Sequence, residues 1–340
     1  MDKATLENLE IFDWPNYAEA FNRADLLLGN GFSINLSPEF SYSSLFEEFL
    51  ATCSGADRAR FCAFRTGNFE AIQRELQAAE RVNALFEIDS PQVTASIQLL
   101  RQGLIKAIRE KHPQASAINK ERIAALTKQL ETFSNIFTLN YDLYLYHIIM
   151  AVRDRYGDPI DPIRFAYNDY FWSRDVDDAR YLDFVNYQKY SFFKHAYYLH
   201  GALFLFPGPL NDKKLRRQDA KELIDCVAEQ IALGNMPLFV SEGRWQEKVN
   251  VIMHSPYLRF AYEGLCGARR KVVIFGTSLA EEQDKHIIDA LNARNRSLAV
   301  AIYVNDRSTD QLKSETHAFR SKFPRHDIIF FDSATLFKFT

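Results

Sequence analysis

Asp25-Leu-Leu-Leu-Gly-Asn-Gly-Phe-Ser-Ile34 is the stretch around which the chain is organised. Residues 25–28 read as a buried strand, and the chain then breaks on Gly29-Asn30-Gly31, with Ser33 two residues further on. A strand that ends on glycines and continues as a helix gathers backbone N–H groups at the start of the helix. That arrangement favours anions such as a dinucleotide pyrophosphate. The alternative is a turn whose glycines are required only for steric reasons.

Other strand-like segments also end on polar residues or glycine. They are 135–139 before Asn140 and Asp142, about 196–199 before His200-Gly201, 271–275 before Gly276-Thr277-Ser278, and 298–304 before Asn305. A short strand at 203–206, a last strand at 327–331, and helices at 143–152, 215–233, 242–250, 256–267, 282–292 and 309–319 complete the pattern. Strands that alternate with helices predict an α/β fold, a Rossmann-like, mostly parallel sheet with helices on both faces. Ligands of such sheets bind beyond the carboxyl ends of the strands.

The chain divides into three expected regions. Residues 1–44 carry a helical N-terminal segment and the first strand of the Rossmann-like domain, followed by a loop at 37–44. Residues 45–130 are rich in Ala, Leu, Gln, Glu and Arg without strand-like alternation, which predicts a helical insertion of four or five helices. Residues 131–340 form the remainder of the Rossmann-like domain, with an irregular excursion expected at 155–195.

Composition narrows the class of protein. The 340 residues carry a net charge of −3 with scattered Lys and Arg, so no direct nucleic-acid binding is expected. No apolar run is long enough for a membrane span and the N-terminus lacks a signal core, so a cytoplasmic protein is expected. The four cysteines form no C-x-x-C pair, which argues against a zinc ribbon, and no metal is predicted. The 28 phenylalanines favour a Phe-rich core or a protein interface over base stacking.

The polar residues at the strand ends each have two interpretations. Asn140 and Asp142 are either caps of the following helix, or Asn140 fixes a water or a ribose hydroxyl while Asp142 holds a polar ligand group. His200 is either a packing residue or a general base, since Gly201 leaves room beside the imidazole. His195, five residues upstream, is not favoured as the base.

Two further groups lie in the last third of the chain. Gly276-Thr277-Ser278 offers a second site for an anion or a ribose, and Asn305 is either a ribose ligand or a plain turn residue. Asp284 and His286 are two residues apart on a predicted helix and therefore point to different faces. We expect them to make helix-surface or interdomain contacts rather than to bind a metal.

Five segments in order resemble the motifs of the SIR2-like NAD-consuming proteins, and most closely a bacterial SIR2-like branch known as DUF4917. They are Leu28-Gly-Asn-Gly-Phe-Ser33, Thr138-Leu-Asn-Tyr-Asp142, Leu199-His-Gly201, Gly276-Thr-Ser278 and Val304-Asn305. The resemblance covers about 20–45 and 131–340, without the helical insertion. It implies NAD as the ligand, bound at its phosphates by the stretch Gly29, Asn30, Gly31, Phe32 and Ser33. It also implies that Asn140 and Asp142 lie at the nicotinamide and its ribose, that Asn140 and His200 are catalytic, and that Gly276, Thr277, Ser278 and Asn305 line the adenosine side.

The chain departs from the SIR2-like deacylases in two ways. It lacks the paired cysteines of their zinc ribbon, and Ser37-Pro-Glu-Phe-Ser-Tyr42 stands where they have a G-I-P-D-F-R type segment. The resemblance therefore implies an NAD⁺ glycohydrolase, the effector of a bacterial anti-phage defence system, that forms a homo-oligomer and has a HerA-like ATPase as a possible partner. The alternatives are a protein deacylase, an ADP-ribosyl transferase, or a non-catalytic subunit that binds NAD or ADP-ribose.

Overall fold

A computed structural model describes residues 3–36, 45–112, 120–155, 167–172, 179–186, 194–217, 221–240 and 244–338. The loop predicted at 37–44 lies outside these residues, as do parts of the excursion predicted at 155–195. In the described part of the chain, no helix is both long and apolar enough to cross a membrane.

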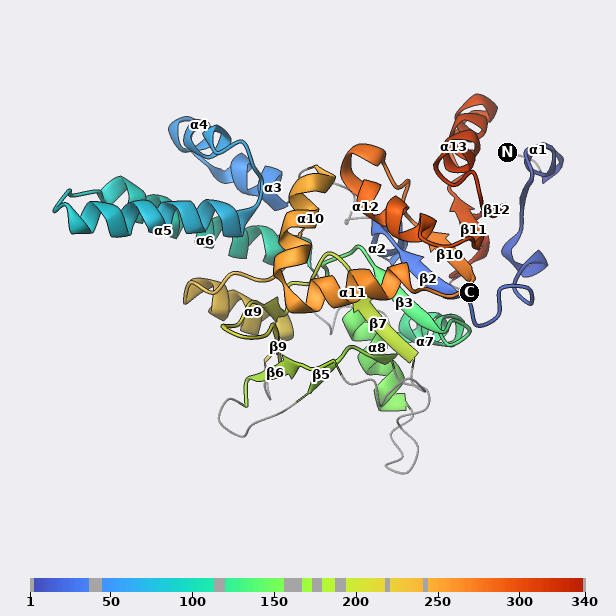
Figure 1. Cartoon of the computed structure of the whole chain (residues 1–340), viewed down its shortest axis with the longest axis horizontal. Coiled ribbons are helices and arrows are strands. Elements are labelled where there is room, and N and C mark those ends of the chain that lie inside the picture. Colours follow the sequence, from blue (N-terminus) through green and yellow to red (C-terminus); the bar gives the residue numbers. More distant parts are fainter. Residues whose placement is uncertain are drawn as a thin grey trace.

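An eight-stranded, entirely parallel sheet forms the centre of the molecule (Figure 1). Its order is β1-β12-β11-β10-β2-β3-β7-β4. The strands are β1 (Ile11–Phe12), β2 (Asp25–Leu28), β3 (Asn135–Thr138), β4 (Tyr167–Asn168), β7 (Lys194–Tyr198), β10 (Lys271–Phe275), β11 (Ser297–Ile302) and β12 (Asp327–Asp332). The predicted α/β class and mostly parallel sheet are confirmed. Apolar runs such as Leu26-Leu-Leu28 are wholly buried, as expected for a sheet covered on both faces.

The strand order reverses beside β2. From β2 the chain moves outward through β3 to β7, and it then returns to the other side of β2 to form β10, β11 and β12 in turn. Apart from the edge strands β1 and β4, this is the order of a dinucleotide-binding Rossmann sheet. The point of reversal lies between β2 and β10, whose carboxyl ends carry Gly29 and Gly276.

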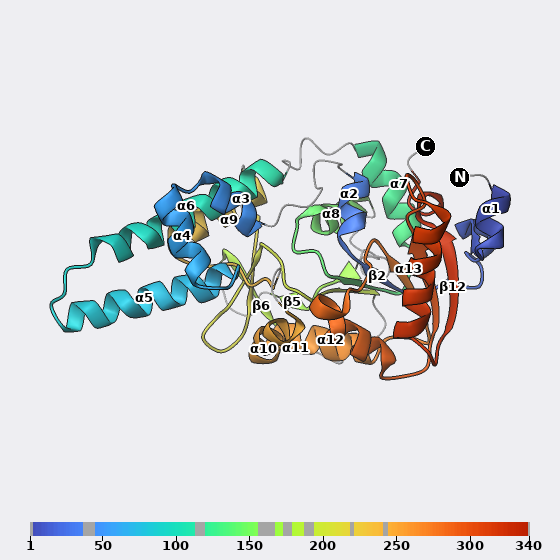
Figure 2. The same cartoon turned by 90° about the horizontal axis from the view of Figure 1, so that it is seen from above.

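Helices cover both faces of the sheet (Figure 2). On one face lie α2 (Asn30–Leu36), α7 (Lys120–Leu130) and α8 (Tyr144–Arg155). On the other lie α10 (Trp245–His254), α11 (Pro256–Cys266) and α12 (Glu281–Asn292). The remaining helix of this part, α13 (Thr309–Lys322), joins β11 to β12.

Four helices of the predicted insertion form an arm that projects from the sheet (Figures 1 and 2). They are α3 (Leu45–Thr52), α4 (Gly55–Ala63), α5 (Phe69–Leu85) and α6 (Pro91–Lys111). The rings of Phe61 and Phe69 pack on Phe49 at the base of the arm. The fifth helix, α7, instead packs against α8 beside the sheet.

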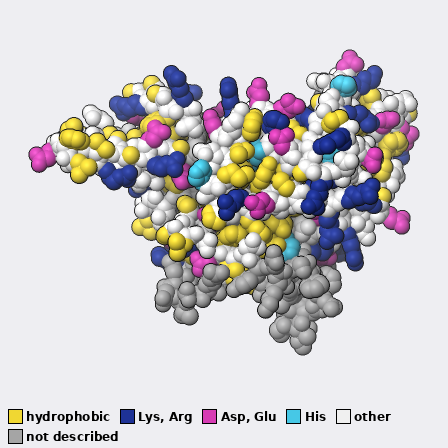
Figure 3. Space-filling view, viewed as in Figure 1, with side chains coloured by type: hydrophobic (Ala, Val, Ile, Leu, Met, Phe, Trp, Pro, Cys, Tyr) yellow, Lys and Arg dark blue, Asp and Glu magenta, His cyan; other side chains and the backbone are white. Residues whose placement is uncertain are grey.

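The free end of the arm exposes apolar side chains. In the last turn of α5, Leu85 is 82% exposed and Val82 is also exposed, and in the loop that follows Phe86 is 72% exposed and Ile88 is also exposed. Figure 3 shows apolar side chains gathered at this end of the molecule. We call these four residues the arm tip.

Several short strands were not predicted. The described parts of 155–195 contain β4, β5 (Phe171–Trp172) and β6 (Tyr181–Phe184), so the excursion is not irregular throughout. With β8 (Leu205–Phe206) and β9 (Lys213–Leu215), β5 and β6 form a second, antiparallel sheet in the order β5-β6-β9-β8. The helix predicted from 215 begins only at α9 (Leu223–Ala232), and Leu215 belongs instead to β9. The N-terminal segment is helical only in α1 (Lys3–Asn8) and around Trp14, with β1 between them.

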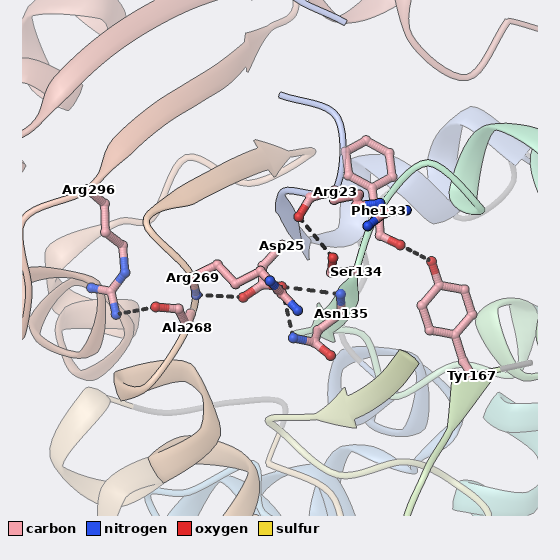
Figure 4. Close-up of polar contacts among 9 residues, drawn as sticks. All are labelled: Arg23, Asp25, Phe133, Ser134, Asn135, Tyr167, Ala268, Arg269 and Arg296. Atoms are coloured by element: carbon pink, nitrogen blue, oxygen red, sulfur yellow. Dashed lines mark hydrogen bonds and ion pairs between the residues drawn. The ribbon is translucent and has the colours of Figure 1, made fainter. Parts of the chain in front are cut away.

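At the amino edge of the sheet, where the strands begin, the Asp25 side chain hydrogen-bonds at the start of both neighbouring strands (Figure 4). This wholly buried carboxylate accepts hydrogen bonds from the backbone N–H of Arg269 (2.7 Å) and from both the backbone N–H and the Nδ2 amide of Asn135 (3.2 and 2.9 Å). One side chain on β2 thus ties the starts of β3 and β10 together. Burial raises the pKa of Asp25, and these hydrogen bonds oppose that shift.

We expect Asp25→Ala to lower the free energy of unfolding by about 2–4 kcal/mol, because it leaves buried N–H donors without an acceptor. Urea unfolding followed by circular dichroism measures this loss. Asp327→Ala is the matched control, since Asp327 is also the first residue of a parallel strand but is exposed. Equal midpoints for the two variants would contradict this role of Asp25.

Candidate functional site

The turns after β2 and β10 touch each other along their backbones. A Cβ atom on Gly29 would lie 2.5 Å from the Thr277 side chain, and one on Gly31 would lie 2.6 Å from the Cα atom of Gly276. Gly276 has a φ of +74°, and a Cβ there would lie 2.6 Å from the backbone nitrogen of Phe32. All three glycines are therefore required by the packing of one turn against the other. The steric interpretation of the glycines accounts for them without a ligand.

Backbone hydrogen bonds join the same two turns. The N–H of Gly29 donates to the carbonyl of Phe275, and the N–H of Gly31 donates to the carbonyl of Gly276, each at 2.8 Å. The N–H of Phe32 donates to the carbonyl of Gly29. Since these three donors bond within the protein, a phosphate at this turn needs other partners. Its binding by the glycine stretch stays a prediction.

We expect Gly276→Ala to lower the free energy of unfolding by roughly 2–5 kcal/mol, because the new methyl group meets backbone atoms and L-residues are strained at this φ. Thermal unfolding measures the effect. Gly267→Ala is the control, since Gly267 has a φ of −84° and its Cβ would meet nothing closer than 3.5 Å. A Gly276→Ala protein as stable as the control would show that the two turns separate readily.

Asn140 follows β3 and is directed at the glycine turn. Its Nδ2 amide donates to the carbonyl of Gly29 (3.1 Å) and to the hydroxyl of Ser33 (3.0 Å). Because a carbonyl oxygen only accepts, the first bond fixes which end of the amide is the nitrogen. No described residue donates to the other end, Oδ1. That oxygen is the atom with which Asn140 can accept a hydrogen bond from a water or a ribose hydroxyl.

Ser33 and Asp142 continue this network beneath Asn140. The Ser33 hydroxyl donates to one carboxylate oxygen of Asp142, and the backbone N–H of Tyr144 donates to the other at 2.8 Å. Burial raises the pKa of Asp142 to about 6, although both hydrogen bonds oppose that shift. Asp142 therefore caps the start of α8, as one of the two interpretations predicted, whereas the Asn140 side chain does not. Ser33 is wholly buried, and its hydroxyl fixes the Asn140 side chain by accepting the hydrogen bond from the Nδ2 amide.

His200 is the second residue after the end of β7, just as Asn140 is the second residue after the end of β3. The two strands are paired with Thr138 opposite Tyr198, so both residues stand two positions beyond the last pair. Gly201, with a φ of +75°, lets the chain turn against 238–239, where a Cβ would lie 2.0 Å from the Leu238 carbonyl oxygen. His200 is 4% exposed, and burial lowers its pKa well below the usual value.

A second histidine lies against His200. The Nε2 atoms of His200 and His286 are 2.9 Å apart, and the two rings are stacked with centroids 5.1 Å apart. His286 comes from α12 and is only 2% exposed, so the expected helix-surface position is wrong. The reason is that α12 packs on α10 and α11 and turns this residue inward. No sequence signal pointed to this contact, because 86 residues separate the two histidines.

A buried ion pair accompanies the histidines. Lys248 on α10 lies 3.4 Å from the Asp284 carboxylate on α12, and its side chain is only 6% exposed. The lysine charge lowers the pKa of both His200 and His286, that of His286 to about 3 in combination with burial. Asp284 and His286 thus have different partners, Lys248 and His200, and Asp284 lies at a kink where the backbone is not helical. Among the described residues, no three His, Cys, Asp or Glu side chains are grouped to hold a metal.

The remaining predicted residues lie at the edge of this group or away from it. The Phe32 ring is buried against Phe275 and Phe337, so it does not line a site. Thr277 is partly exposed and accepts from the N–H of Leu279, whereas Ser278 and Asn305 are exposed. His195 is buried against Tyr170, at the start of β7 and thus at the opposite end of that strand from His200.

These contacts define a Rossmann-like α/β protein with a polar site at the carboxyl edge of its parallel sheet. The site combines an oriented amide oxygen, a buried carboxylate and a pair of uncharged imidazoles, a set suited to orienting a hydroxyl or water and moving its proton. The chain belongs to the family described as a domain of unknown function, DUF4917, whose model matches residues 26–336. A search of curated proteins found no match.

Proposed function

We propose that the protein is an NAD⁺ glycohydrolase of the SIR2-like type, which cleaves NAD⁺ to nicotinamide and ADP-ribose. The observation that carries the proposal is that Asn140 and His200 follow the carboxyl ends of two adjacent strands in a Rossmann-ordered sheet, with Asn140 bonded to the glycine turn at the reversal point. Dinucleotides bind such sheets at that point. The resemblance to SIR2-like motifs, in the same order along the chain, supports the same ligand.

The reaction needs little covalent chemistry from the protein. The bond between the ribose C1′ and the nicotinamide nitrogen breaks with its electron pair going to nicotinamide, which leaves uncharged, and positive charge develops on the ribose. Asn140 Oδ1 accepts a hydrogen bond from the attacking water and orients its oxygen toward C1′. His200 takes up the proton that the water loses, or that of a ribose hydroxyl. A neutral imidazole has the nitrogen lone pair that this step requires.

The test is mass spectrometry of the nucleotide products after incubation of the purified protein with NAD⁺. Equal amounts of nicotinamide and ADP-ribose support the proposal. Release of acyl groups from lysine peptides or ADP-ribose attached to protein would instead identify a deacylase or a transferase. Nucleotide that binds without turnover, both with the protein alone and with the product of a neighbouring gene, would identify a regulatory subunit.

We further propose, from the same resemblance, that the protein acts in bacterial anti-phage defence by depleting NAD⁺. An enzyme that consumes an essential cofactor must be restrained, which favours control by assembly into a homo-oligomer or by a HerA-like ATPase. The exposed arm tip, with Leu85 and Phe86 largely open to solvent, supports an assembly role for the arm. Light scattering of the protein alone and with the candidate ATPase measures assembly, and the NAD⁺ assay on the same samples measures control.

A further inference from the structure

The histidine pair at the end of β7 contains one member that the proposed reaction does not yet use. We propose that His286 is a positioning residue, whose Nε2 lone pair accepts the Nε2 proton of His200 and so keeps the His200 Nδ1 lone pair available as the base. The inference rests on the proposed function for the role of His200. It adds a residue that does not touch the substrate.

The geometry of the pair limits where the protons are. Two nitrogens 2.9 Å apart form a hydrogen bond only if one carries a proton and the other a lone pair. If His200 carries the proton on Nε2, its Nδ1 is a lone pair and accepts a proton from water or a hydroxyl. If His286 carries it, the neutral His200 is protonated on Nδ1 and has no lone pair left. Only the first arrangement is compatible with a base.

The surroundings of the pair keep it uncharged. Lys248 faces it from α10 as a cation, and Asp284 on α12 is held by that lysine at 3.4 Å. From α11, the Tyr262 ring is stacked at 6.4 Å from His286. Burial and the lysine charge lower the pKa of both imidazoles, so neither gains a second proton at neutral pH. In an uncharged pair one proton lies between the two Nε2 atoms. Which histidine carries this proton decides whether His200 Nδ1 has a free lone pair.

The other nitrogen of each ring distinguishes their roles. Nδ1 of His286 is buried and, among the described residues, has no hydrogen-bond partner. In the proposed arrangement this atom carries the His286 proton without an acceptor, a cost that the hydrogen bond to His200 has to offset. Nδ1 of His200 makes no hydrogen bond within the described part of the chain either, but it is not among the buried unpartnered atoms. Both side chains are almost wholly buried, but the Nδ1 atom of His286 is enclosed by protein, whereas that of His200 is the one left to meet a substrate.

The first experiment is nitrogen NMR of histidine-labelled protein at pH 7.5, without NAD⁺. The protein has eight histidines, and the signals of His200 and His286 are identified as those that disappear in His200→Gln and His286→Gln. We expect His200 to be protonated on Nε2 and His286 on Nδ1. The reverse pattern would overturn the inference. Because this readout needs no turnover, it decides the tautomer even if the protein does not hydrolyse NAD⁺.

The second experiment compares two substitutions of His286 by steady-state kinetics of NAD⁺ hydrolysis. His286→Leu removes the acceptor and is expected to lower kcat at least ~10-fold with KM changed less than about twofold, because a misplaced tautomer weakens a catalytic histidine without weakening binding. His286→Gln keeps an acceptor near the Nε2 position and is expected to restore most of kcat. His254→Leu, which removes an exposed histidine of α10, is the control.

The outcomes separate the inference from the proposed function. Equal kcat for His286→Leu and His286→Gln, both folded by circular dichroism, would overturn the positioning role while leaving NAD⁺ hydrolysis intact. Failure of the unmodified protein to hydrolyse NAD⁺ would overturn the proposed function instead, and the NMR pattern would still decide how the pair is protonated.

Discussion

Asn140→Ala is expected to lower kcat for NAD⁺ hydrolysis about 10²–10³-fold, because it removes the amide that orients the attacking water in the proposed mechanism. The orientation comes from the bonds of its Nδ2 to Gly29 and Ser33, which leave Oδ1 as the acceptor. The lost amide also costs about 1–2 kcal/mol of stability, since Gly29 and Ser33 lose a donor. Nicotinamide release at saturating NAD⁺ measures the first effect and urea unfolding the second.

Tyr167→Phe is the matched control for Asn140→Ala. The Tyr167 hydroxyl is buried and its proton is shared between the carbonyls of Leu130 (2.5 Å) and Phe133 (3.1 Å), at the amino edge of the sheet; Figure 4 shows the contact with Phe133. Its loss destabilises the fold by a similar amount without touching the carboxyl edge. If Tyr167→Phe keeps full activity while Asn140→Ala loses it, the loss in Asn140→Ala comes from catalysis and not from reduced stability. Equal activity of the two variants would remove Asn140 from the mechanism.

His200→Gln is expected to lower kcat about 10²–10⁴-fold, the usual contribution of a general base. Glutamine retains hydrogen-bonding capacity toward His286 but takes up no proton. His195→Gln is the control, because His195 is also buried on β7 but stacks on Tyr170 at the start of that strand. Hydrolysis that survives in His200→Gln would mean that another group takes the proton, and hydrolysis lost equally in His195→Gln would indicate a structural effect.

The same substitution is expected to change how stability depends on pH. Both histidines have a pKa that is lower in the folded protein than the usual 6.5, so the unfolded chain binds more protons in that range. Stability therefore falls as the pH drops below about 6.5, and this loss continues toward pH 3. With one histidine of the pair removed, urea midpoints measured from pH 7.5 to 4.5 are expected to decline less steeply than those of the unmodified protein.

The central strands of the main sheet could be predicted because each is an apolar run followed by glycine or a polar residue. β2, β3, β10 and β12 lie within a residue or two of their predicted bounds. β1, β4 and β5 contain two residues each, too few to show any periodicity, and β9 (Lys213–Leu215) includes two lysines. Their pairing depends on neighbours distant in the sequence, such as Ile11 with Phe330. These elements could not be recognised from local pattern.

The candidate site was predictable in part for the same reason. Asn140, Asp142 and His200 follow strands, and parallel strands bring their carboxyl ends together, so these residues could be selected from the chain. The role of the glycines could not be decided from the sequence, because only the structure shows that Gly31 packs closely against Gly276. His286 and Lys248 lie within helices, where the residue type alone does not tell which face turns inward. Their contacts depend on how α10 and α12 pack.

The position of β2 in the chain has a consequence for synthesis. This strand is synthesised before both of its neighbours, which begin only at residues 135 and 271. Asp25 bonds to a residue 244 positions later, and His200 meets its partner only at residue 286. The nascent chain thus cannot close the sheet around β2 until most of it has been translated. A chain cut short before β10 would carry Asn140 and His200 without the second turn or His286, so we expect premature termination to yield an inert product.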